Sequence, residues 1–168
     1  MMALLSALAI ESAHVVGLSM GGYVCFEFVR RYQDLLRGLV LVGTQPAGDS
    51  DASRQARYET AELVRREGSS ALAEKLIPRF LGTTTLANKP EVVETVRTLI
   101  QSNSPEAIAQ ACYGLAARRD STPFLPEIKT PTLMVSGSED GLIPLKYSSS
   151  LRYLWSSSSR TSSVHLFT

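Results

Sequence analysis

Histidine, cysteine and net charge are all scarce in this 168-residue chain. It has two histidines, two cysteines and one tryptophan, and its formal net charge is +1. Lysine and arginine are scattered rather than clustered, so we expect no nucleic-acid partner. Cys25 and Cys112 lie in apolar stretches without metal-ligand spacing, which favours buried reduced thiols, a cytoplasmic protein and no metal. No apolar run is long enough to cross a membrane, and we expect no membrane partner.

The most informative segment is Gly17-Leu18-Ser19-Met20-Gly21-Gly22. It follows the apolar run His14-Val15-Val16 and precedes residues 23–32, which have helical periodicity. A G-x-S-x-G sequence between a strand and a helix is typical of a nucleophile elbow, in which a strained turn presents the serine. The segment therefore predicts that Ser19 is a nucleophile.

The residues around Ser19 have expected roles of their own. A side chain at Gly17 or Gly21 is predicted to crowd the turn, and Gly22 is predicted to let the helix pack close to the sheet. The backbone N–H of Met20 is predicted to point at the carbonyl oxygen under attack, as one donor of an oxyanion hole.

Two later segments share with the elbow a resemblance to a known family. Residues Arg37–Thr44 look like the next strand of an α/β-hydrolase, and Leu125–Asp140 look like its late strand and acid loop. The chain resembles the single-domain esterase and lactonase branch, which includes the 3-oxoadipate enol-lactonase-like hydrolases, over roughly residues 4–146. The resemblance implies a serine hydrolase that acts on a small-molecule ester or lactone and uses no cofactor.

The expected fold class is α/β: a few-stranded, mostly parallel sheet flanked by helices. Short unbroken apolar runs predict buried strands at 13–17, 38–43 and 132–136. Residues 50–121 have helical periodicity, and the resemblance implies that they form a helical lid insertion within one domain, residues 1–168. Asn88 and Glu91 form a candidate capping box, and Ser104-Pro105-Glu106 suits a first helical turn.

The position of the elbow predicts a chain shortened at both ends. In the resembled family the elbow lies near the middle of the domain, whereas here the serine is residue 19. The first strands and the loop with the second oxyanion-hole N–H have no counterpart. Met1–Ile10 is expected to be a helix that buries Leu4, Leu5, Leu8 and Ile10 on one face; a signal peptide is the alternative interpretation, disfavoured by the lack of lysine or arginine before the apolar stretch.

Acyl transfer by a serine needs a base and an acid as well as the nucleophile. Asp140 is the preferred acid because it follows the carboxyl end of a strand, and its alternative role is to cap a turn. Asp49 and Asp51, in the loop after the preceding strand, are the fallback acids.

The chain has two histidines that could act as the base. Five extended residues, roughly 16 Å, separate His14 from Ser19, so His14 is expected to be structural. His165 follows Ser19 and Asp140 in the order found in the resembled family, and it is the candidate base. Its neighbours, Val164-His165-Leu166-Phe167, are typical of a strand rather than of an exposed loop.

Three hypotheses remain open from the sequence. The first is an active ester or lactone hydrolase with Ser19, Asp140 and His165 as its triad. The second is a catalytically inactive hydrolase-derived fragment, without the oxyanion loop and catalytic histidine, that binds a partner or has no function. The third is half of an enzyme completed by another chain, because an exposed sheet edge beside the elbow strand favours self-association.

Overall fold

The computed structural model describes residues 1–137, 140–143 and 163–167, the last of these through the backbone alone. The chain forms two compact units, which we call the sheet unit and the helical unit. The sheet unit comprises Met1–Ala47, Asp120–Ser138 and Ile143–Thr168, and the helical unit comprises Gly48–Arg119 and Glu139–Leu142.

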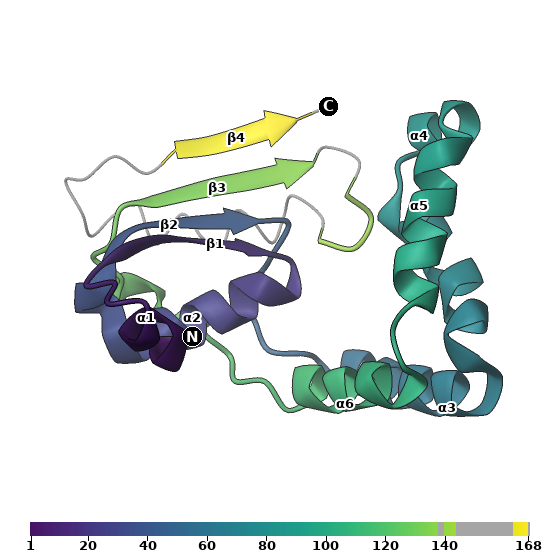
Figure 1. Cartoon of the computed structure of the whole chain (residues 1–168), viewed down its shortest axis with the longest axis horizontal. Coiled ribbons are helices and arrows are strands. Elements are labelled where there is room, and N and C mark those ends of the chain that lie inside the picture. Colours follow the sequence, from purple (N-terminus) through teal and green to yellow (C-terminus); the bar gives the residue numbers. More distant parts are fainter. Residues whose placement is uncertain (138–139, 144–162, 168) are drawn as a thin grey trace. The chain divides into compact units, whose positions relative to one another are not determined.

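The sheet has the strand order β1-β2-β3-β4, and each neighbouring pair is parallel (Figure 1). The strands are β1 (Ala13–Leu18), β2 (Leu36–Val42), β3 (Thr132–Gly137) and β4 (Ser163–Phe167). The three strands predicted from apolar runs are confirmed to within two residues at each end. The strand suggested at 164–167 is confirmed as β4. Runs of valine and leucine suit central parallel strands because such strands are usually covered on both faces.

Helix α2 (Met20–Tyr32) covers one face of this sheet, as Figure 1 shows. Two short 3-10 helices precede the next two strands: η1 (Gln33–Leu35) leads into β2, and η2 (Thr122–Glu127), which buries Phe124 and Leu125, comes before β3. The core of the sheet unit is a cluster of buried apolar side chains: Cys25, Phe26, Val29, Leu39, Leu41, Phe124, Leu125, Ile128 and Met134. Burial raises the pKa of the Cys25 thiol.

Side chains on the other face of β1 are exposed. Val16 and Leu18 alternate with core-facing residues and are 66% and 67% exposed. Helix α1 (Met2–Ala7) buries Leu5 only, so the prediction that Leu4, Leu8 and Ile10 share its buried face is wrong. Their side chains are exposed because no described element of the sheet unit packs over them. Within the described residues, no helix is both long and apolar enough to cross a membrane.

The helical unit confirms the helices predicted within 50–121. It contains α3 (Asp51–Phe80), α4 (Thr83–Asn88), α5 (Pro90–Gln101) and α6 (Pro105–Ala116). Helix α3 is broken at Gly68, whose φ of +82° is unfavourable for any residue with a Cβ. Helices α3 and α6 lie side by side (Figure 1) around a buried cluster of Ala61, Val64, Leu72, Ala109 and Cys112.

An ion pair on the surface joins α3 to α6. The Arg65 guanidinium donates two hydrogen bonds, of 3.0 and 2.9 Å, to the Glu106 carboxylate. These bonds hold the pKa of Glu106 at about 2. Because both groups are exposed to solvent, the pair orients the two helices more than it stabilises them.

One helix start was predicted correctly and one was not. Ser104 caps α6, and its Oγ accepts a hydrogen bond of 3.1 Å from the Ala107 N–H. The capping box predicted at Asn88 and Glu91 is wrong. Lys89 is the N-cap of α5, while Asn88 ends α4 and donates its side-chain amide to the Thr84 carbonyl.

Asp49 anchors the start of the helical unit. Its buried carboxylate accepts hydrogen bonds from Arg118 at 2.7 Å and from Arg57 at 3.1 Å. Burial by itself would raise the pKa of Asp49, but these two guanidinium groups outweigh burial and hold that pKa below its usual range. The carboxylate therefore stabilises the folded state only while it is ionised.

We predict that Asp49→Asn lowers the free energy of unfolding by about 3 kcal/mol, because it removes the charged partner of a buried arginine. Asp51→Asn is the matched control, since the Asp51 side chain is exposed, and it should change stability by less than about 0.5 kcal/mol. Urea denaturation measures both. Equal effects from the two variants would contradict the assignment.

The stabilities of wild type and Asp49→Asn should also differ in their dependence on pH. A carboxylate with a lowered folded-state pKa contributes stability above its unfolded pKa of about 3.9, and this contribution is lost as the pH falls through the folded value. The stability difference between wild type and Asp49→Asn should therefore be constant from pH 5 to 7 and shrink below about pH 4. A difference that grows in acid would exclude this role.

Candidate active site

Ser19 occupies a strained turn between a strand and a helix. Strand β1 ends at Leu18 and α2 begins at Met20, so Ser19 alone forms the link. Its backbone has φ of 49° and ψ of −111°. Among the described residues, only it and Ala9 are non-glycine residues with positive φ. Such strain costs of the order of 1–3 kcal/mol and persists only where neighbouring groups enforce it.

Strand β2 supplies part of that enforcement. The Ser19 N–H donates to the Val42 carbonyl at 2.8 Å. The Ser19 carbonyl accepts two hydrogen bonds of 2.9 Å, from the Gly22 N–H and from the Thr44 hydroxyl. Both backbone polar groups of Ser19 are thus held, while the residue as a whole is exposed.

Two of the three elbow glycines have the expected role. A Cβ at Gly17 would lie 2.5 Å from the Cys25 sulfur and 2.6 Å from the Gly21 carbonyl oxygen. A Cβ at Gly22 would lie 2.6 Å from the Cβ of Thr44, just beyond the end of β2. The prediction that a side chain at Gly21 would crowd the turn is wrong, because such a Cβ meets nothing within 4 Å.

The N-terminus of α2 gives the site beside Ser19 a positive electrostatic potential. Met20 and Gly21 are its first residues, and the first N–H groups of a helix have no intrahelical acceptor. The partial positive charge of the helix N-terminus also favours an anion beside Ser19. This arrangement suits stabilisation of a tetrahedral oxyanion, the role predicted for the Met20 N–H.

The three candidate acids differ in their surroundings. Asp49, one of the two fallback acids, has both carboxylate oxygens bound by arginines, one by Arg57 and one by Arg118, so it has a structural role. Asp51 lies in the first turn of α3 and pairs with Arg54. Asp140 follows β3 by three residues, and its Oδ1 accepts a hydrogen bond of 2.9 Å from the Leu142 N–H. Asp140 therefore caps a turn, which leaves its predicted role as the acid untested.

His165 lies inside β4, where its Cα pairs with that of Val135. Val135 pairs with Val42, and Val42 pairs with Leu18. Three strand spacings of about 4.8 Å therefore separate the backbones of His165 and Leu18, about 14 Å in all. A histidine and a serine side chain are too short to bring their polar atoms within hydrogen-bond distance across that separation. Catalysis by His165 would require its segment to leave the β4 pairing.

His14 is the second residue of β1 and lies five residues before Ser19, as expected. It is exposed on the strand, and its Nδ1 lies 2.6 Å from the position of a Cβ on Gly38. Gly38 therefore gives the His14 ring its place against β2, which accords with a structural histidine.

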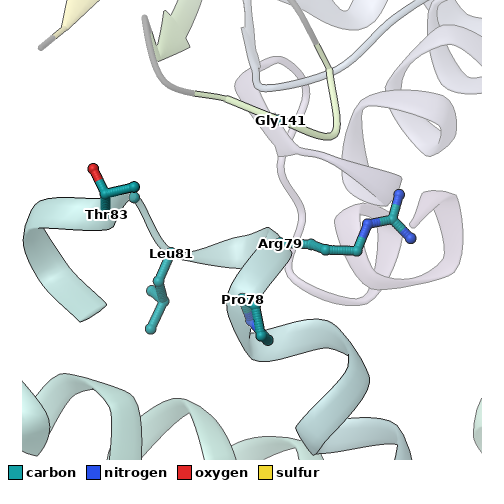
Figure 2. A pocket seen from close by; sticks show the side chains of 6 residues that line it. Pro78, Arg79, Leu81, Thr83 and Gly141 are labelled. Carbon is teal, nitrogen blue, oxygen red and sulfur yellow. The ribbon is translucent and has the colours of Figure 1, made fainter. Parts of the chain in front are cut away.

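A cavity of about 460 Å³ lies in the helical unit (Figure 2). Its lining consists of Pro78, Arg79, Leu81, Gly82, Thr83 and Gly141. Figure 2 shows Arg79, its one charged residue, and Thr83 coming from the end of α3 and the start of α4. Among the described residues, no group of three or more histidine, cysteine, aspartate or glutamate side chains is arranged to hold a metal. The described lining residues include no histidine, cysteine, aspartate or glutamate.

Comparison with known proteins decides the family. The profile of the alpha/beta hydrolase fold family matches residues 1–164. The chain belongs to the alpha/beta hydrolase fold family. The predicted fold class and resemblance are thereby confirmed.

Individual relatives in the family agree. The chain is 31% identical to 3-oxoadipate enol-lactonase 2 of Acinetobacter baylyi over 142 residues, which cover 82% of this chain and 50% of the relative. It is 31% identical over 160 residues to a 2-hydroxy-6-oxo-6-phenylhexa-2,4-dienoate hydrolase of Comamonas testosteroni, covering 90% of this chain and 54% of that one. A thermophilic esterase from Thermogutta terrifontis superposes with a TM-score of 0.89 at 38% identity, covering 98% of this chain and 59% of that one.

Membership of the hydrolase family accounts for the elbow at Ser19. The chain spans about half the length of the curated relatives it matches. Sequence analysis also missed Thr44, whose hydroxyl binds the Ser19 carbonyl. The only signal in the sequence was a hydroxyl residue directly after the strand predicted at 38–43, a pattern too common to indicate a contact.

The elbow glycines give a paired test. We predict that Gly22→Ala lowers the free energy of unfolding by about 1–3 kcal/mol, because its methyl group overlaps Thr44. Gly21→Ala should be neutral or stabilise the chain by up to about 1 kcal/mol, since alanine favours the helix and meets open space. Urea denaturation of both variants distinguishes them. A larger loss for Gly21→Ala would refute the packing described.

Proposed function

We propose that this alpha/beta hydrolase cleaves a small ester or lactone with Ser19 as its nucleophile. The observation that carries the proposal is the strained backbone of Ser19, held at both its N–H and its carbonyl beside the N-terminus of α2. Strain of this kind concentrates at functional sites. The substrate class is supported by the relatives, whose names are those of a lactonase and an esterase.

The proposed reaction has two steps. In the first, the Ser19 Oγ attacks the acyl carbon, its proton passes to the base, and the developing oxyanion binds the Met20 N–H. The alcohol leaves with that proton, and an acyl-serine ester remains. In the second, the base removes a proton from water and the resulting hydroxide attacks the acyl carbon. The bond from that carbon to Ser19 Oγ then breaks, the base returns the proton to Oγ, and the acid product leaves.

Asp140 and His165 are the proposed acid and base. Asp140 is three residues after Gly137, the end of β3. Three steps of extended chain span at most about 10 Å, so Asp140 stays near the carboxyl end of β3. In a parallel sheet this is the edge at which β1 leads into Ser19. His165 can serve only after release from β4, for the reason given by its register with Val135.

The helical unit is the proposed lid over the substrate. Phe80 and Leu99 are large apolar residues that it leaves exposed, and such side chains suit contact with an acyl group. The proposed location is the cytoplasm, supported by Cys25 and Cys112, which are both free buried thiols.

The alternative is an inactive hydrolase-derived chain. It is favoured by one observation, the place of His165 inside β4 rather than in a loop. In this case the elbow would keep its geometry without a base to activate the serine.

We predict that the full chain reacts with a fluorophosphonate and that Ser19→Ala abolishes the labelling. Ser102→Ala is the control, because Ser102 is an exposed serine at the end of α5, outside the elbow. This variant should label as the wild type does. If His165 is the base, His165→Ala should slow labelling at least 100-fold. A folded chain, shown by circular dichroism, that does not label supports the inactive alternative.

We also propose that a second copy of the chain covers the free edge of β1. Strand β1 ends the strand order and carries the exposed Val16 and Leu18. An uncharged edge of this kind is a template for strand pairing. Leu4 and Leu8, in and just after α1, are further exposed apolar residues of the same unit.

This association predicts a dimer in sedimentation velocity at micromolar concentration. Val16→Lys should shift the chain to monomer, because a lysine opposes pairing at an edge. Leu99→Lys adds the same charge at an exposed position of α5 and should leave the dimer intact. A wild-type monomer, or equal effects of the two variants, would exclude the β1 edge as the interface.

A further inference from the structure

Thr44 lies two residues after the end of β2 and is only 3% exposed. Its hydroxyl donates to the Ser19 carbonyl oxygen at 2.9 Å. This hydrogen bond joins a buried side chain to the backbone of the candidate nucleophile, 25 residues earlier in the chain. It therefore affects the geometry of the Ser19 peptide.

The geometry of the peptide bond determines this effect. The Ser19 carbonyl and the Met20 N–H belong to one planar peptide group and point in opposite directions. A hydrogen bond that fixes the carbonyl therefore also fixes the direction of the N–H. It polarises the group as well, which makes that N–H a stronger donor.

The same end of β2 controls both sides of Ser19. The Val42 carbonyl accepts the Ser19 N–H, and the Thr44 hydroxyl binds the Ser19 carbonyl. The Thr44 side chain is itself held by packing, because its Cγ2 and Cβ lie within 2.6 Å of where a Cβ on Gly22 would be. Gly22 thus admits the threonine, and the threonine orients the peptide.

We propose that Thr44 is a positioning residue of the oxyanion hole, which sets the direction of the Met20 N–H through the Ser19 carbonyl. The catalytic consequence rests on the proposed hydrolase function. Thr44 touches no reacting atom and acts only through the Ser19–Met20 peptide.

Two substitutions separate the hydroxyl from the shape of the side chain. Thr44→Val keeps the shape and removes the hydroxyl, whereas Thr44→Ser keeps the hydroxyl and removes the methyl group. With p-nitrophenyl acetate, Thr44→Val should lower kcat about tenfold with KM changed less than twofold. Thr44→Ser should restore most of that loss. Equal kcat values for wild type and Thr44→Val would overturn the catalytic role.

Thr132→Val is the matched control. Thr132 is also 3% exposed, and its hydroxyl also donates to a backbone carbonyl, that of Thr130, at 2.9 Å. It lies at the start of β3, outside the proposed site. Thr132→Val should cost similar stability and leave kcat unchanged. A tenfold fall in kcat for this variant too would show that loss of a buried hydroxyl acts through stability alone.

A second readout does not depend on activity. In ¹H–¹⁵N spectra of the full chain, Thr44→Val should shift the Met20 amide signal and speed hydrogen exchange at Gly22, whose N–H shares the Ser19 carbonyl. Thr44→Ser and Thr132→Val should leave both near their wild-type values. Wild-type signals in Thr44→Val would overturn the positioning role whether or not the chain is active. A wild-type chain that hydrolyses nothing would overturn the proposed function, while the amide signals still decide the role of Thr44.

Discussion

The hydrogen bonds that hold the Ser19 peptide are the constraint on which the rest of the site depends. Ser19 has a backbone conformation that a residue with a Cβ rarely adopts. It is retained because β2 accepts its N–H and Thr44 binds its carbonyl. The helix α2 also packs closely against the ends of β1 and β2. A Cβ at Gly17 would overlap Cys25 of α2, and a Cβ at Gly22 would overlap Thr44, which follows β2.

The described part of the sheet unit is a parallel sheet with its apolar core on one face. Its buried cluster lies between the strands and α2 with η2, while Val16 and Leu18 face the other way and are exposed. Parallel sheets are normally covered on both faces. The chain spans about half the length of the relatives it matches, and Val16 and Leu18 form an exposed apolar surface on β1.

The carboxylates show how the surroundings of a residue select its role. Asp49 and Asp140 both follow strands and were both candidates for the acid. Asp49 is bound by two arginines, which lower its pKa and tie α3 to the segment after α6. Asp140 instead binds the backbone of its own turn. Nothing in the local sequence distinguishes these two aspartates, because Arg118 is 69 residues from Asp49.

Local sequence patterns were sufficient to predict three of the strands, the helical character of 50–121 and the family. These patterns are local: the apolar runs at 13–17, 38–43 and 132–136, the helical periodicity within 50–121 and the G-x-S-x-G turn. Local patterns follow from the steric and hydrophobic preferences of neighbouring residues. Tertiary structure alone decided which faces are buried, as the exposed Leu4 and Leu8 show, and which distant group meets Ser19. The contact with Thr44 joins the ends of two strands, and the separation of His165 from Leu18 follows from strand order. Both depend on pairing between segments far apart in the chain, which no local pattern encodes.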